Sequence, residues 1–244
     1  ARRVEVVERS TRIALQGNTA RRTATLSAAE DNLESLDFSR AFDPDRAQAG
    51  GRSAYVRITR GCNKFCTYCV VPQTRGAEVH RPPEHLVEEC RRLVDAGVVE
   101  ITLLGQTVNH YSYTHGAAVS SDGRELAQVG PGGAAFRNGA THGAKVTTFA
   151  ELLHRIHESV PEIRRLRFVT SYPRDFSDEA LGVMRDCSRI CRYLHVPAQS
   201  GSNAVLDRMN RGYCVEEYEA FIDRARAIVP GVEIAGDIIV GFPG

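Results

Sequence analysis

The chain has 244 residues, of which 42% are hydrophobic and 25% charged, and its formal net charge is +1. This composition is typical of a folded globular protein and excludes collagen-like, mucin-like and wholly disordered chains. No apolar run approaches the ~20 residues that cross a bilayer, and no signal peptide opens the chain. We therefore expect a cytoplasmic protein with no membrane partner.

The first part of the chain shows no clear hydrophobic period. Residues 4–7 and 12–15 have the composition of short strands, and residues 43–51 are polar and rich in turn formers. We interpret residues 1–50 as the tail of an amino-terminal domain and a linker, and residues 51–244 as a second domain.

From residue 54 onward, strand and helix patterns alternate. The alternation predicts strands at residues 55–59, 100–104, 165–170, 193–196 and 233–240, and helices at residues 83–96, 148–159, 178–187 and 215–229. This order is typical of an α/β protein with a parallel sheet, either a partial barrel or a doubly wound sheet. Residues 112–146 interrupt it with a Gly-, Ala- and Ser-rich stretch without a period, which we interpret as a solvated insertion rather than a substrate lid.

Three of the seven cysteines lie within eight residues, on the loop that leaves the first strand. Cys62, Cys66 and Cys69 have the spacing C-x3-C-x2-C, which in a cytosolic chain indicates metal or redox chemistry. Three thiolates on one loop can hold a [4Fe–4S] cluster and leave one iron without a protein ligand. The alternatives are a zinc site with His80 as the fourth ligand, and unrelated buried thiols. Cys187 and Cys191 are interpreted as core or partly buried thiols, and Cys90 and Cys214 as core or surface thiols.

The residues around these cysteines carry a family resemblance. The string CNKFCTYCVVPQTRG at residues 62–76, followed by Arg81-Pro82, resembles the radical S-adenosylmethionine (SAM) methylthiotransferases. The string LLGQTVN at residues 103–109 is similar to the LLGQNVN signature of their tRNA branch. This sequence departs from that branch at Thr107, where Asn is usual, and at His80, where Ser is usual. The alternatives are the branches that modify ribosomal protein S12 or threonylcarbamoyladenosine in tRNA, and a non-enzymatic, zinc-stabilised RNA-binding module.

The resemblance implies a fold, cofactors and partners. It implies a partial, TIM-like radical SAM (β/α) barrel, truncated after the fifth strand, with residues 1–50 as a remnant of an amino-terminal methylthiotransferase domain. Cys62, Cys66 and Cys69 would hold a [4Fe–4S] cluster with exchangeable SAM, and a second [4Fe–4S] cluster is expected in the full-length protein. The implied reaction is methylthiolation of C2 of N6-dimethylallyladenosine at position 37 of tRNA. The expected partners are the tRNA anticodon loop and an electron donor such as flavodoxin or ferredoxin, and we expect a monomer.

Polar residues follow the predicted strands, at the edge where βα barrels gather their functional groups. The resemblance implies that five of them surround SAM: Gln106, Asn109, Ser171, Gln199 and Ser200. Each has a structural alternative. Gln106 and Asn109 would cap the backbone of their loop, Ser171 would belong to a turn, and residues 199–202 would cap a helix at residues 203–209.

Two further features stand near these loops. Asp237 lies within an apolar predicted strand, where an unpaired charge is costly, so we predict a partner or a ligand for it. Arg208 and Arg211 flank a polar turn, and we interpret them as contacts to tRNA phosphate or to the SAM carboxylate, or as solvated side chains.

Overall fold

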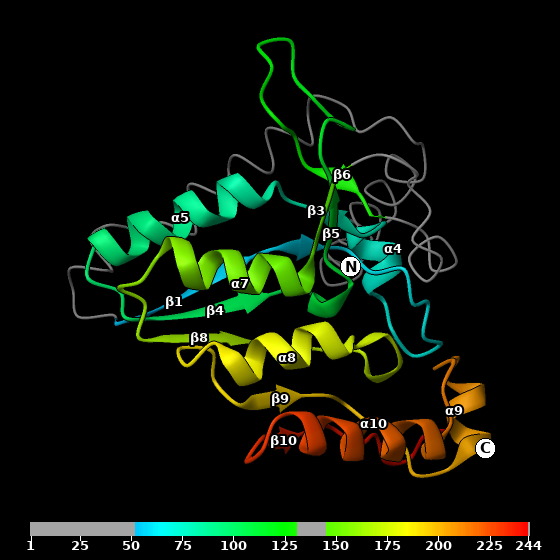
Figure 1. Cartoon of the computed structure of the whole chain (residues 1–244). Helices are drawn as coiled ribbons and strands as arrows, with labels where there is room; N and C mark the ends of the chain where they lie inside the picture. Colours follow the sequence, from blue (N-terminus) through cyan, green and yellow to red (C-terminus); the bar gives the residue numbers. More distant parts are fainter. Residues whose placement is uncertain (1–51, 131–144, 244) are drawn as a thin grey trace, which may run out of the picture.

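The computed structural model describes residues 52–130 and 145–243 (Figure 1). The predictions for residues 1–50, including the strands at 4–7 and 12–15 and nearly all of the linker, lie outside the described residues. The same holds for residues 131–144 of the predicted insertion.

Parallel strands form the centre of the fold. β1 (Ser53–Arg57), β4 (Glu100–Leu104) and β8 (Arg165–Phe168) pair in the order β1-β4-β8, and β9 (Tyr193–His195) pairs with β10 (Glu233–Ala235). A parallel bridge between Leu166 and Ile190 joins β8 to the segment before β9. The spatial order follows the chain order, as in part of a barrel, whereas a doubly wound sheet reverses its order. All five predicted strands are confirmed.

Helices connect these strands along one face (Figure 1). They are α5 (Pro83–Asp95), α7 (Phe149–Ser159), α8 (Asp178–Asp186) and α10 (Val215–Ile228), and each contacts the next in that order. The start of α7 is set by a capping box, in which Thr148 Oγ1 accepts from the Glu151 amide at 3.2 Å. The four predicted helices are confirmed, and α9 (Asn203–Arg208) confirms the short helix that was the alternative for residues 203–209.

The hydrophobic core lies between the strands and these helices. Val56, Ile101 and Phe168 from the strands are at most 1% exposed, as are Leu86 and Ile156 from the helices. Cys90 and Cys187 belong to the same cluster, which confirms the interpretation of both as core thiols. No helix in the described ranges is long and apolar enough to span a membrane.

The predicted insertion is more regular than its composition indicates. β5 (Ser112–Thr114) pairs with β7 (Val146–Thr148), and β6 (Gln128–Val129) completes an antiparallel sheet with β2 (Thr59–Arg60) and β3 (Val79–His80). Tyr113 is fully buried, and its hydroxyl donates to the Leu126 carbonyl at 2.8 Å. Both ends of the segment therefore have regular structure although the sequence shows no period there, and Tyr113 reaches the core.

Candidate metal centre

The cysteine loop, residues 61–69, lies between β2 and α4 (Val71–Arg75). Gly61 begins it with φ 75°, and a Cβ at this position would lie 2.0 Å from the Ala77 carbonyl oxygen. The Cys62 amide donates to the Gly76 carbonyl at 3.2 Å, and the Cys69 amide donates to the Cys66 carbonyl at 3.0 Å. Glycine is required here because both the backbone angle and the available space exclude a side chain.

The three thiols are free and turn inward to different extents. Cys62 and Cys66 are each 9% exposed, Cys69 is half-buried, and burial raises the pKa of the Cys62 thiol. Within the described ranges, one group of three metal-ligating side chains has its ligand atoms within 4.8 Å of one another. None of these cysteines belongs to that group. At least two of the three sulfur atoms are therefore more than 4.8 Å apart, wider than the ~3.8 Å between thiolates on a tetrahedral zinc ion.

His80 serves packing. It is 1% exposed, its Nδ1 accepts from the Ser112 amide at 3.4 Å, and its ring meets the edge of Tyr111 at a centroid distance of 5.6 Å. Burial lowers the pKa of His80 to about 4. The structure therefore gives no support to His80 as the fourth ligand of a zinc site.

A turn after α9 packs against the cysteine loop. The Thr67 amide donates to the Met209 carbonyl at 3.1 Å, and Asn210 Nδ2 donates to the Phe65 carbonyl at 2.9 Å. From the same turn, Arg211 Nη1 donates to Cys66 Sγ at 3.2 Å. Arg211 is 7% exposed, so its interpretation as a solvated side chain is wrong.

A part-buried ionic network supports the other side of the loop. Lys64, which lies between Cys62 and Cys66, pairs with Asp175, and His110 Nε2 lies 2.7 Å from the same carboxylate oxygen. Burial opposes the charge on Asp175, but hydrogen bonds from His110 and Lys64 outweigh it and lower the pKa of Asp175 below its ordinary value. The sequence reasoning missed Asp175 and His110. The signal available was Lys64, one of two lysines among 31 basic residues.

The loops after β4, β8, β9 and β10 meet at the edge that carries the cysteine loop. In Figure 1 the arrows of β1, β4 and β8 point to the side where α4 and α9 lie. The Cys62 and Thr107 side chains are 3.9 Å apart, the Val108 amide donates to the Thr170 carbonyl, and the Ser171 amide donates to the His195 carbonyl. The structure thus brings the predicted strand-end segments together.

The five predicted SAM residues divide into two kinds. Asn109 is buried, and its amide is fastened to the Tyr172 backbone by two hydrogen bonds of 2.8 and 3.0 Å, which is the structural alternative. Ser200 Oγ accepts from the Ser202 amide at 3.2 Å, also a local backbone contact.

The other three residues keep free polar groups. Ser171 is 4% exposed, and its hydroxyl has no partner among the described residues. The side-chain amides of Gln106 and Gln199 likewise make no hydrogen bond within the described part of the chain. The backbone of Gln199 has φ 69°, and its backbone amide donates to the Asp237 carbonyl at 2.9 Å. Such unpartnered groups remain available for a ligand.

The expectation for Asp237 requires a correction. β10 ends at Ala235, so Asp237 lies outside the strand, and its side chain is 69% exposed. Asp237 Oδ2 lies 3.2 Å from His195 Nε2, so the expected partner exists, but the cost of a buried charge does not apply.

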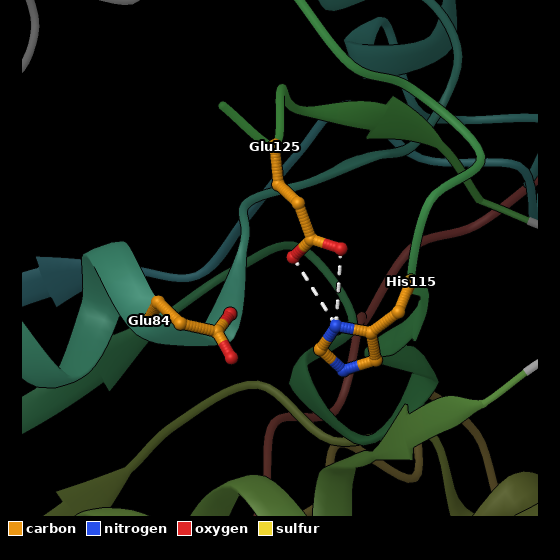
Figure 2. A group of neighbouring side chains, drawn as sticks. All are labelled: Glu84, His115 and Glu125. Atoms are coloured by element: carbon orange, nitrogen blue, oxygen red, sulfur yellow. Dashed lines mark hydrogen bonds and ion pairs between the residues drawn. The ribbon is translucent and has the colours of Figure 1, made fainter. Parts of the chain in front are cut away.

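A second group of ligand-type side chains holds the insertion. Atoms of Glu84, His115 and Glu125 lie within 4.8 Å of one another (Figure 2). His115 Nδ1 is 3.1 Å from Glu125, its Nε2 is 2.8 Å from Thr147 Oγ1, and Glu84 pairs with Arg155 at 2.9 Å. Because each member already has a protein partner, we interpret this group as a structural hydrogen-bond network.

The site around the cysteine loop fits an iron–sulfur cluster with a polar small molecule beside it. It provides three free thiols, a buried guanidinium against one of them, and an unpartnered buried hydroxyl at Ser171. A parallel barrel segment with this loop at the carboxyl edge of its strands indicates a radical SAM protein, and the comparisons with known proteins agree. Residues 56–244 match the radical SAM superfamily, and the chain belongs to that superfamily. Its cofactors are a [4Fe–4S] cluster and SAM.

The comparisons also provide particular relatives. The chain is similar to proteins named tRNA-2-methylthio-N(6)-dimethylallyladenosine synthase. The one from Moorella thermoacetica is 42% identical over 83% of this chain and 39% of the relative. The one from Rhodopirellula baltica is 44% identical over 78% of this chain and 34% of the relative. The one from Agrobacterium fabrum is 41% identical over 89% of this chain and 41% of the relative. The chain therefore spans about two fifths or less of these relatives, and the predicted resemblance is confirmed.

Solved structures support the fold. The radical SAM methyltransferase TsrM from Kitasatospora setae superposes with a TM-score of 0.51 at 16% identity, over 78% of this chain and 31% of that chain. Apo OxsB, a cobalamin-dependent SAM radical enzyme, superposes with a TM-score of 0.51 at 14% identity, over 78% of this chain and 24% of that chain. At such identities the likeness shows the fold alone, and it confirms the predicted partial radical SAM barrel.

Proposed function

We propose that this chain is the radical SAM domain of a tRNA methylthiotransferase that modifies C2 of N6-dimethylallyladenosine at position 37. The observation that carries the proposal is the convergence of the cysteine loop and the LLGQTVN segment, through Cys62 and Thr107, at one edge of the barrel. The names of the relatives support the tRNA substrate. In this proposal residues 51–244 form the incomplete core domain, and residues 1–50 are the tail of an amino-terminal domain.

The residues of this chain have separate roles in the proposal. Cys62, Cys66 and Cys69 would hold a [4Fe–4S] cluster, and three protein ligands would leave one iron free to take SAM. When bound, the cluster and SAM would supply radical chemistry, which the proposal directs at C2 of the adenosine. Ser171 offers a buried hydroxyl, and Gln106 and Gln199 offer side-chain amides, to the polar groups of SAM. We assign positioning roles to the other two predicted residues: Asn109 holds the Tyr172 loop, and Ser200 orders its own turn.

The proposed partners follow from this chemistry. A tRNA substrate presents the anticodon loop as splayed, single-stranded bases, because side chains do not reach bases inside an A-form helix. Phosphate contacts make such binding weaken with salt. The reaction also requires a one-electron donor of the flavodoxin or ferredoxin type. The greater length of the relatives leaves room for the second [4Fe–4S] cluster and a carboxy-terminal RNA-binding domain.

The test uses the full-length parent protein in a host that lacks its own enzyme. Nucleoside mass spectrometry of the host tRNA is expected to show the 2-methylthio form of the modified adenosine. Replacement of Cys62, Cys66 or Cys69 by Ala is expected to remove the iron of one cluster, about four irons per chain, and to abolish the modified nucleoside. Cys191→Ser is the matched control, because this half-buried thiol lies outside the cysteine loop. Appearance of a methylthio group on ribosomal protein S12, with the tRNA unchanged, would refute the substrate assignment.

A further inference from the structure

The surroundings of Arg211 lack the group that usually accompanies a buried cation. Its side chain packs against the rings of Tyr172 and Tyr213, with Cζ 4.9 and 5.1 Å from the ring centroids. Its Nε donates to Tyr213 Oη at 3.1 Å, and its Nη1 reaches Tyr68 Oη at 3.4 Å. Among residues 52–130 and 145–243, no carboxylate pairs with it. The protein therefore encloses a positive charge among neutral phenols.

An unpaired buried charge is costly, so a fold that retains one implies an anion in the working protein. The group nearest in chemistry is Cys66, whose sulfur accepts from Arg211 Nη1 at 3.2 Å. A thiol is a weak acceptor, whereas a thiolate that ligates a cluster carries the negative charge that this donor requires.

The position of Arg211 relative to Cys66 is set by the backbone. Asn210 and Gly212, the residues on either side of it, both have positive φ, 55° and 66°. The Arg211 amide donates to the Leu206 carbonyl at 3.0 Å, and Asn210 Nδ2 binds the cysteine loop at Phe65. The turn thus fixes the Arg211 backbone beside the cysteine loop, and the contacts with Tyr172 and Tyr213 hold its guanidinium against the thiol.

We propose that Arg211 is a positioning residue that raises the reduction potential of the cluster through its hydrogen bond to Cys66. Reduction adds one electron, taken from the external donor, and therefore one negative charge to the cluster. A fixed cation in contact with a ligand sulfur favours the reduced form, since potentials depend on net charge and on hydrogen bonds to the sulfurs. This inference rests on the proposed function, because it requires the cluster.

The experiment is a redox titration of the chain reconstituted with iron and sulfide, followed by the electron paramagnetic resonance signal of the reduced cluster. Arg211→Met keeps the length of the side chain and removes its charge. We expect the equilibrium for reduction to fall at least tenfold, which is ~59 mV to more negative potential for a one-electron couple. Arg211→Lys retains the charge and is expected to recover most of the shift. Arg226→Met, at an exposed arginine on α10, is the control and is expected to leave the midpoint unchanged.

The outcomes separate this inference from the proposed function. If the unmodified chain binds no cluster, the proposed function fails. If the chain binds the cluster but Arg211→Met titrates at the same midpoint, the inference is wrong. An unchanged midpoint with SAM binding weakened tenfold would assign Arg211 to the SAM carboxylate instead. Loss of the cluster from both the Met and the Lys variants, with native circular dichroism, would also overturn the inference, since Lys preserves the charge.

Discussion

Asn109 and Gln106 lie in one loop, and the structure predicts opposite consequences for their replacement by Ala. Asn109→Ala removes two buried hydrogen bonds to the Tyr172 backbone. A neutral hydrogen bond contributes ~1 kcal/mol net, and each buried group left unpaired costs ~1–3 kcal/mol. The free energy of unfolding is therefore expected to fall by about 2–4 kcal/mol. Gln106 is half-buried and has no partner in the described residues, so Gln106→Ala is expected to change stability by less than ~0.5 kcal/mol.

Urea unfolding followed by circular dichroism measures the first effect, and calorimetric titration of the reconstituted chain with SAM measures the second. Gln106→Ala is expected to weaken SAM binding at unchanged iron content, while Asn109→Ala lowers the unfolding midpoint. If Asn109→Ala leaves the midpoint unchanged and weakens SAM binding, the two hydrogen bonds do not hold the loop, and Asn109 is a ligand to SAM. If Gln106→Ala loses iron, its loop is structural.

Three further outcomes follow from buried groups near the site. Burial lowers the pKa of His80 from 6.5 to about 4, so between these pH values the unfolded chain binds a proton that the folded chain does not. The contribution of neutral His80 to stability is therefore complete above pH 6.5 and falls by about 3 kcal/mol towards pH 4. His80→Gln is expected to remove this pH dependence from the urea midpoints. Asp175→Asn removes the negative charge that pairs with the part-buried Lys64 and is expected to cost ~3 kcal/mol in urea unfolding, whereas the exposed Asp186→Asn costs less than ~0.5 kcal/mol. Equal midpoints for the two variants would refute the network. Gly61→Ala places a Cβ 2.0 Å from a backbone carbonyl oxygen and is expected to lower the iron content, and full iron loading would contradict the steric argument.

The barrel segment and the cysteine loop can be predicted from local patterns in the sequence. Apolar residues at helical and strand periods mark all five strands and four helices, because one face of each element has to be buried. The three cysteines lie within eight residues, so their shared loop is visible without a fold. The strand-end segments could be placed at one edge because parallel strands have their carboxyl ends together.

Tertiary structure decided which polar residues are partnered. Arg211 and Cys66 are 145 positions apart, and Lys64 and Asp175 are 111 apart, so no local pattern pairs them. Asn109 and Gln106 both carry a side-chain amide, but only Asn109 lies against the Tyr172 backbone and is hydrogen-bonded to it. Sequence predicts which elements bury a face, but the charge and hydrogen-bond state of each site residue depends on distant segments that meet only in the folded chain.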